Sequence, residues 1–261
     1  MYDTLKLETD ARGVASVWLV RPEKHNALSA RLIADLHAAA DALASDEDVR
    51  VVVLAAEGES FCAGADLAWM RAQFEASPEA RRDEANRLAR MLQALNTLPK
   101  PLIARVQGQA FGGGIGLLSV CDAAIGTNGA RFALSETRLG LIPATIGPYV
   151  AARLGPARAR RVFMTSRRFD AAEAVRLGLL SAAVPEDSLD EAVAREVAPC
   201  LACAPGAVSE AKALLRSFGP VIDEAVIARS VDALVACWDG DEAREGVSAF
   251  FDKRTPNWAT E

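Results

Sequence analysis

Residues 102–142 read LIARVQGQAFGGGIGLLSVCDAAIGTNGARFALSETRLGLI. The short apolar run Leu102–Val106 predicts a buried strand, and the apolar run Ile115–Val120 predicts a helix. Glycines separate the two, at Gly108 and at 112–114. Glycine is typical of sites where backbone approaches a ligand closely, and the first N–H groups of a helix have no partner within it. We therefore expect this turn to offer N–H donors to an anion, or to an oxygen that becomes negative during a reaction.

A lone acid, Glu136, follows further along the same stretch. Its neighbours in sequence are mostly apolar: Phe132, Leu134, Leu139, Leu141 and Ile142. An apolar setting disfavours the charged form of a carboxyl group and holds it ready for proton transfer. Donors for a developing oxyanion together with one such carboxylate are what proton chemistry next to a carbonyl requires.

Composition narrows the class of protein. The chain has 261 residues, of which 51% are hydrophobic and 25% charged, which is typical of a globular protein. The formal net charge of −6 argues against nucleic acid or an anionic membrane as a partner. The sequence has no run of about 18 apolar residues, and its first ten residues, MYDTLKLETD, carry too many charges for a signal peptide. We expect a cytoplasmic protein.

The cysteines indicate reduced thiols. They are odd in number, as expected of a chain without a disulfide framework: Cys62, Cys121, Cys200, Cys203 and Cys237. Cys200 and Cys203 form a C-x-x-C pair, but no second pair and no histidine lie nearby. We interpret them as two small core residues one helical turn apart, and we expect no metal site.

The remaining pattern predicts an α/β fold. Apolar runs predict strands at 14–20, 49–56, 102–106, 123–127 and 131–134. Ser29 and Ser77 are predicted to cap helices that run to about residues 44 and 98, and Asp170–Glu173 reads as a capping box. Strands alternating with helices favour a layered architecture with right-handed crossovers.

The character changes after this region. Further helices are predicted at 189–201, 208–215, 221–238 and 241–251. We predict a core at residues 1–185 and a helical C-terminal region at 186–261. From the sequence alone, this region packs equally well on a neighbouring subunit or on its own core.

Several motifs occur together, in order, over nearly the whole chain. They are Arg21-Pro22, Asn26-Ala27-Leu28, Ala63-Gly64-Ala65-Asp66-Leu67, Gln107–Gly114, Cys121-Asp122, Glu136–Pro143 and Glu245-Gly246 with Arg254. Each is weak alone, but the ordered set resembles the enoyl-CoA hydratase/isomerase (crotonase) superfamily. The resemblance implies a spiral of β-β-α units with a helical C-terminal extension. It also implies a homotrimer, or a hexamer built as a dimer of trimers, with the C-terminal helices at subunit contacts.

The resemblance further implies an acyl thioester of coenzyme A as substrate, with no separate cofactor because coenzyme A is part of the substrate. The backbone N–H groups of Ala65 and Gly113 would form the oxyanion hole, and Glu136 would be the catalytic acid–base. Positions matched to substrate or coenzyme A binding are Lys24, Ala27, Ala63, Asp66, Leu67, Gly112, Gly116, Ser135 and Lys253, and Arg254 is a further candidate for a phosphate.

Two departures from the family pattern bear on the reaction. Hydratases of the family carry a first glutamate where this chain has Gly116, and most relatives continue after the Ile-Pro pair with glycines where this chain has Ala144–Tyr149. One carboxylate suffices to move a proton between carbons, which favours an isomerase. The sequence of residues 144–149, together with Gly116 and Leu134-Ser135-Glu136, instead resembles the bacterial branch of methylglutaconyl-CoA and carboxygeranoyl-CoA hydratases of leucine and terpenoid breakdown. This resemblance favours hydration of a branched or carboxylated substrate.

Other classes of protein fit less well. A nicotinamide-binding oxidoreductase would need a third glycine where Leu117 stands. A serine hydrolase would need a G-x-S-x-G elbow, which is missing from the sequence. A non-catalytic acyl-CoA-binding relative is opposed by the presence of Glu136 and of both oxyanion positions. We expect the pocket walls to include Met70, Phe74, Leu139 and Ile142.

Overall fold

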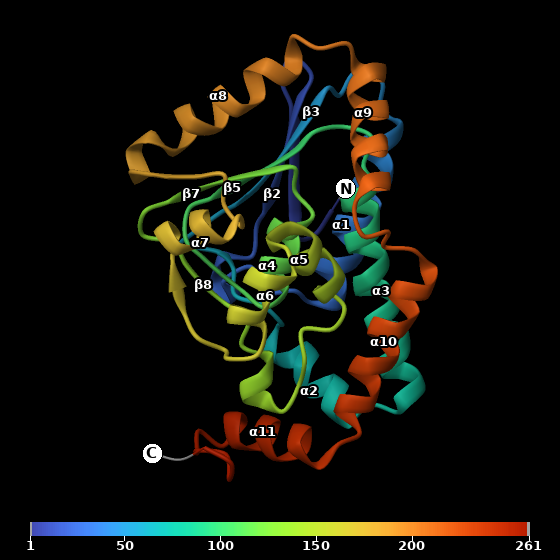
Figure 1. Ribbon diagram of the computed structural model, residues 1–261, viewed down its shortest axis with the longest axis vertical. Coiled ribbons are helices and arrows are strands. Elements are labelled where there is room, and N and C mark those ends of the chain that lie inside the picture. Colours follow the sequence, from blue (N-terminus) through green and yellow to red (C-terminus); the bar gives the residue numbers. More distant parts are fainter. Residues whose placement is uncertain (1, 260–261) are drawn as a thin grey trace.

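The computed structural model describes residues 2–259. Its strands form two sheets, and helices cover both faces of the larger one (Figure 1). The strands are β1 (Leu5–Thr9), β2 (Val14–Leu19), β3 (Val51–Ala56), β4 (Ser60–Cys62), β5 (Leu102–Val106), β6 (Gln109–Phe111), β7 (Ala123–Thr127), β8 (Arg131–Ala133), β9 (Phe169–Asp170) and β10 (Ala182–Val184).

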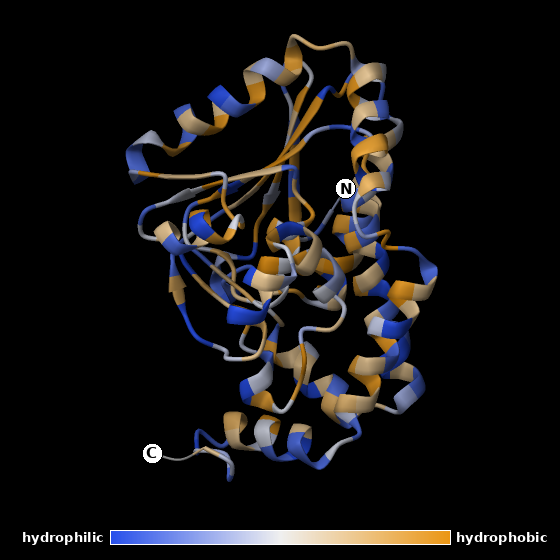
Figure 2. Cartoon of the chain, viewed as in Figure 1, coloured by the Kyte–Doolittle hydropathy of each residue, from blue (hydrophilic) through white to orange (hydrophobic). Residues whose placement is uncertain are grey.

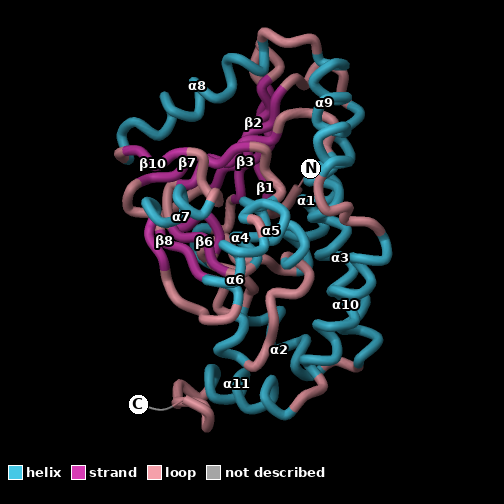
Figure 3. The backbone as a smooth tube through the Cα atoms, viewed as in Figure 1, coloured by secondary structure: helices cyan, strands magenta, loops and turns pink. Residues whose placement is uncertain are grey.

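Figure 3 shows the strands gathered together, with helices packed around them. The α-helices are α1 (Ala30–Ser45), α2 (Leu67–Glu75), α3 (Pro78–Thr97), α4 (Gly113–Ser119), α5 (Gly147–Leu154), α6 (Pro156–Phe163), α7 (Ala171–Leu177), α8 (Leu189–Leu201), α9 (Pro205–Phe218), α10 (Glu224–Trp238) and α11 (Asp241–Phe251). Short 3₁₀ helices are η1 (Pro22–Lys24), η2 (Glu136–Leu139) and η3 (Glu186–Ser188). No helix within the described part of the chain is long and apolar enough to cross a membrane.

The larger sheet has the strand order β1-β2-β3-β5-β7-β10. Only its first pair, β1 and β2, is antiparallel, and the other neighbouring strands are parallel. Parallel sheets are normally covered on both faces, which explains why β3 is an uninterrupted apolar run. Val51 and Val53 pack toward α8, whereas Val52 and Leu54 pack in the main core with α1 and α3. Figure 2 shows the hydrophobic strands inside and helices with alternating apolar and polar bands outside.

Most of the predicted elements are confirmed. The side chains of Ser29 and Ser77 cap α1 and α3, accepting hydrogen bonds from the N–H groups of Leu32 and Ala80. The Asp170 side chain caps α7 in the same way. The helix predicted from residue 221 begins three residues later, at Glu224, because the Asp223 side chain caps it.

One interpretation was wrong. Cys200 is half-buried in α8, but Cys203 is exposed, since α8 ends at Leu201 and Pro205 begins the next helix. The two thiols are therefore not a pair of core residues. The helices after residue 186 also pack on the chain's own core, α8 against the larger sheet and α10 against α3.

The smaller sheet, with the order β4-β6-β8-β9, positions the site. Strands β4, β6 and β8 are mutually parallel, so their carboxyl ends lie at the same edge. Ala65 follows β4, Gly113 follows β6 and Glu136 follows β8. Parallel strands bring the loops at their carboxyl ends together, which is where α/β sheets bind ligands. Residues far apart in sequence thus meet in one place.

Candidate active site

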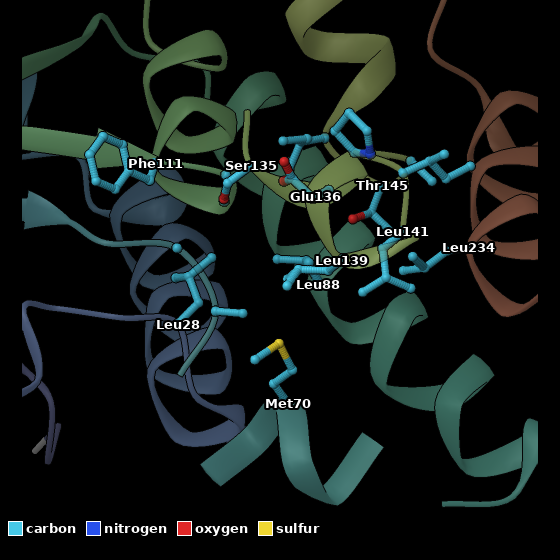
Figure 4. Close-up of a pocket in the computed structure, with 18 of the residues that line it drawn as sticks. Leu28, Met70, Leu88, Phe111, Ser135, Glu136, Leu139, Leu141, Thr145 and Leu234 are labelled. Carbon is cyan, nitrogen blue, oxygen red and sulfur yellow. The ribbon is translucent and has the colours of Figure 1, made fainter. Parts of the chain in front are cut away.

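A cavity of about 430 Å³ opens at this edge of the smaller sheet. Its walls come from the loop after β4, the turn before α4, the segment from η2 to α5, and helices α2, α10 and α11. Most of its lining is apolar, and the labelled apolar side chains around it in Figure 4 are Leu28, Met70, Leu88, Phe111, Leu139, Leu141 and Leu234. Such a cavity, with a few polar groups in an apolar wall, is typical of a small-molecule site.

The two loops that carry the predicted oxyanion donors are in direct backbone contact. A Cβ at Gly64 would lie 3.2 Å from the carbonyl oxygen of Phe111, and a Cβ at Gly114 would lie 2.5 Å from the carbonyl oxygen of Cys62. A side chain at Gly114 would collide with backbone, so the glycine there permits the approach. The glycine run thus packs the helix start against the loop after β4.

The N–H groups of Ala65 and Gly113 form no hydrogen bond within the described part of the chain. The N–H of Leu28 donates to the carbonyl of Gly64 (2.7 Å), and the N–H of Asp66 donates to the carbonyl of Leu28 (2.9 Å). These bonds use the peptide groups on either side of Ala65, so its own N–H points away from Leu28. Gly113 is the first residue of α4, and its N–H has no partner within the helix.

Neither N–H donates a hydrogen bond to any group of residues 2–259. Ala65 and Gly113 both line the cavity. Two residues in the wall of one apolar cavity whose backbone donors are unused within residues 2–259 suit an oxygen that gains negative charge.

Glu136 begins η2 and lines the same cavity. The N–H of Gly112 donates to the carbonyl of Ala133 (2.9 Å), which ties the glycine turn to the strand that leads to Glu136. Gly112 has a φ of +46°, and a Cβ there would lie 2.9 Å from Glu136 Oε1. Glycine at this position therefore both adopts the left-handed backbone and leaves room for the carboxylate.

One oxygen of the Glu136 carboxylate has no partner among the described residues. Its Oε2 is buried and forms no hydrogen bond within the described residues. Burial raises the pKa of Glu136 to about 7, because an apolar environment disfavours the charged form. Among residues 2–259, no other carboxylate side chain lines the cavity. A single acid that titrates near neutral pH can both accept and return a proton.

The structure places the other predicted positions in three settings. Ala63, Leu67, Gly112 and Ser135 line the cavity together with the residues above. Lys24 and Lys253 are exposed and outside the lining, although Lys253 follows Phe250 of α11, which is part of it. Ala27 and Gly116 are buried outside the lining.

Two further charged positions are engaged by the protein itself. The Asp66 carboxylate caps α2, accepting from the N–H groups of Ala68 and Trp69, and pairs with Arg21 at 2.9 Å. Hydrogen bonds from these partners keep the pKa of Asp66 below its usual range, despite the opposing effect of burial. The guanidinium of Arg254 forms a two-point pair with Glu245 (2.6 and 2.8 Å).

Sequence reasoning missed several residues of the lining. Arg138 and Arg168 line the cavity, and the Arg168 guanidinium lies over the Phe111 ring, 5.6 Å from its centroid. Thr145 also lines it. Arg138 and Thr145 lie in motifs that the sequence analysis had singled out, whereas no motif in the neighbouring sequence points to Arg168. Of the predicted walls, Met70, Leu139 and Ile142 are present, but Phe74 is not: it packs in a neighbouring cluster with Trp238.

The architecture and the site together define a class of protein: a crotonase fold with two mixed sheets and C-terminal helices, whose site combines free backbone donors with a buried glutamate. A sequence model described as enoyl-CoA hydratase/isomerase matches residues 9–261. The chain belongs to this family and is an enzyme of it.

Solved structures and curated proteins agree with that assignment. An enoyl-CoA hydratase from Shewanella pealeana is 37% identical with a TM-score of 0.81, covering 99% of this chain and 97% of that one. The AtuE protein of Pseudomonas aeruginosa is 36% identical with a TM-score of 0.79, covering 99% and 100%. The enoyl-CoA hydratase ACTT6 of Alternaria alternata is 33% identical over 241 residues, which are 91% of this chain and 78% of that protein.

Proposed function

We propose that the protein is an enoyl-CoA hydratase that adds water across the 2,3 double bond of an acyl-CoA thioester. The observation that supports this proposal is that Ala65, Gly113 and Glu136 line one apolar cavity, and that the N–H groups of the first two and Oε2 of Glu136 have no hydrogen-bond partner within residues 2–259. The N–H groups would bind the thioester oxygen and stabilise the enolate. Each such donor lowers a barrier of this kind by about 3 kcal/mol.

The reaction balances with one carboxylate. As the oxygen of water bonds to the β-carbon, Glu136 accepts a proton from that water. The π electrons of the double bond move toward the thioester oxygen, held by the N–H groups of Ala65 and Gly113. Glu136 then returns the proton to the α-carbon, and the carbonyl re-forms. Glu136 begins and ends the cycle ionised, so hydration and dehydration require the same protonation state.

For the acyl group we propose a branched or carboxylated chain, such as that of methylglutaconyl-CoA. Arg138 and Arg168 line an otherwise apolar cavity and form no ion pair with an acid among the described residues. A guanidinium is the side chain best suited to bind a carboxylate at two points. These two arginines therefore support a substrate with a second carboxylate. Such a substrate would place the enzyme in the breakdown of a branched carbon skeleton.

We propose further that the coenzyme A arm follows the loops around the cavity. Ala63 and Leu67 line it directly, and Ala27 lies beside Leu28, which does the same. Lys24 and Lys253 are exposed cations at the ends of η1 and α11, where a phosphate can reach them. Asp66 would act by fixing α2 and Arg21, Ser135 by forming part of the wall, and Gly116 by leaving room for Ile146, which lines the cavity.

The assembly we propose is a homotrimer, or a hexamer built from two trimers. Large apolar side chains near the end of α9 are exposed, among them Leu215 at 71% and Phe218 at 76%. Exposed apolar groups at this density are typical of an interface. Residues 186–261 would serve both as that interface and as a cover for the site, since Leu234 and Trp238 of α10 and Phe250 of α11 line the cavity.

A second candidate function is isomerisation of a 3-enoyl-CoA to the 2-enoyl isomer. One observation favours it: Glu136 is the only carboxylate side chain that the described residues bring to the cavity. A single carboxylate can shuttle one proton between the α- and γ-carbons without water.

A panel assay separates the two. Loss of enoyl-thioester absorbance is followed with crotonyl-CoA, methylcrotonyl-CoA and methylglutaconyl-CoA, alongside a 3-enoyl-CoA shift assay. We expect hydration, with the carboxylated substrate having the highest kcat/KM. Turnover of the 3-enoyl substrate alone would show that the protein is an isomerase.

A further inference from the structure

The two departures from the family pattern are opposite sides of one contact. A Cβ at Gly116 would lie 2.4 Å from Cγ2 of Ile146 and 3.0 Å from its Cβ. Ile146 is only 3% exposed and is itself part of the cavity wall. The isoleucine fills the space that a side chain at position 116 would need. The site is thus built to do without an acid on α4, and any substitute must come from elsewhere in the wall.

Thr145 is placed to be that substitute. It immediately precedes Ile146, it lines the cavity, and it is 5% exposed. Its hydroxyl forms no hydrogen bond with any group of residues 2–259. Figure 4 shows its oxygen turned toward the side of the cavity that holds the Glu136 carboxylate. A hydroxyl that faces a cavity and has no partner among the described residues is suited to binding water or a ligand.

The unpaired oxygens of these two side chains match the needs of one water molecule. Glu136 Oε2 is a buried acceptor without a donor, and the Thr145 hydroxyl is a second acceptor on the same cavity. Water has two O–H donors to give. When both are used, a lone pair of its oxygen remains free and its orientation is fixed.

We propose that Thr145 positions the attacking water, in place of a second carboxylate. This inference rests on the proposed hydratase function. One O–H of the water donates to Oε2 of Glu136 and the other to Oγ1 of Thr145, which directs a lone pair at the β-carbon. Glu136 takes the proton that is transferred, and Thr145 takes none.

The test compares two variants of Thr145, one without the hydroxyl and one with it. Thr145→Val removes the hydroxyl and keeps the branched side chain, whereas Thr145→Ser keeps the hydroxyl. Each is assayed for hydration of the best substrate of the panel, giving kcat and KM. Each is also assayed by NMR for exchange of the α-hydrogens of butyryl-CoA with D₂O. That exchange needs Glu136 and the oxyanion donors, but no water molecule has to add to a carbon atom.

We expect Thr145→Val to lower kcat for hydration by about 10- to 100-fold, the range for one lost hydrogen bond that positions a reacting group. KM and the rate of α-exchange should stay within about 3-fold of wild type, and Thr145→Ser should retain most of kcat.

Hydration by Thr145→Val at the wild-type rate would overturn the proposal. Equal losses in hydration and exchange would also overturn it, because they would show a structural role. A wild-type enzyme that exchanges α-hydrogens yet hydrates no enoyl-CoA would refute the hydratase function itself, and the water site with it.

Discussion

Replacing Glu136 by glutamine should stabilise the protein relative to wild type, and this gain in the free energy of unfolding should be larger at neutral pH than at acid pH. Burial raises the pKa of Glu136 from its ordinary value of 4.5 to about 7. Below pH 4.5 the side chain is protonated in both folded and unfolded chains. Above it the unfolded chain ionises first, so stability is lost as the pH rises toward 7 and is constant beyond that. The full difference corresponds to about 3 kcal/mol, since one pKa unit is worth 1.36 kcal/mol.

The measurement is urea unfolding at pH 5, 6, 7 and 8, at one protein concentration because assembly would otherwise shift the result. The free energy of unfolding of Glu136→Gln minus that of wild type should rise by about 2.5 kcal/mol between pH 5 and pH 8. Because the test uses only the change of this difference with pH, any cost of burying the amide that is the same at every pH drops out. Glu210→Gln, at an exposed position of α9, is the control and should show no such rise. A flat difference for Glu136→Gln would refute the claim that the fold holds this carboxylate in an unfavourable state.

Three further outcomes follow from the same geometry. The rate of hydration should rise with pH through a single ionisation near 7 and then stay level, since one carboxylate serves both proton steps; a bell-shaped profile would point to a second acid. Gly116→Ala should cost about 1–3 kcal/mol of unfolding free energy by overpacking against Ile146. In a chain that already carries Ile146→Ala, adding Gly116→Ala should not have this cost. Additive effects of the two substitutions would show that the positions are not coupled. Arg138→Gln should lower kcat/KM for methylglutaconyl-CoA by about 10-fold or more, while crotonyl-CoA turnover changes little; equal losses on both substrates would assign the arginine to the coenzyme A arm instead.

Elements with a long or uniform pattern could be predicted from the sequence. Strand β5 was predicted with the bounds that the structure gives, as were α8 and α11. Hydrophobic spacing and capping residues suffice for these elements, because they bury one continuous apolar face. Helix α2 was missed, since its sequence LAWMRAQFE has no clear apolar stripe and depends on the Asp66 cap for its start.

The parts that build the site were harder to read. Strands β4 and β6 have three residues each, too few for a periodic pattern, yet their parallel pairing is what brings Ala65 and Gly113 to one cavity. The setting of Glu136 could be anticipated, because its apolar neighbours are adjacent in sequence. The unpaired hydroxyl of Thr145 could not, since a hydroxyl's partners are decided by contacts between distant segments.

A cavity with one buried carboxylate instead of two also destabilises the fold less. Two carboxylates in a cavity this apolar would repel each other, and each would raise the pKa of the other beyond the effect of burial. With Gly116 and Ile146 closing the second position, burial is the main influence on the pKa of Glu136 and raises it to about 7, against a smaller lowering by its own backbone N–H. That value leaves a substantial ionised fraction at neutral pH and still lets the protonated form give its proton to carbon. A neutral threonine can orient water without adding charge, so in the proposed mechanism one ionisable group is enough.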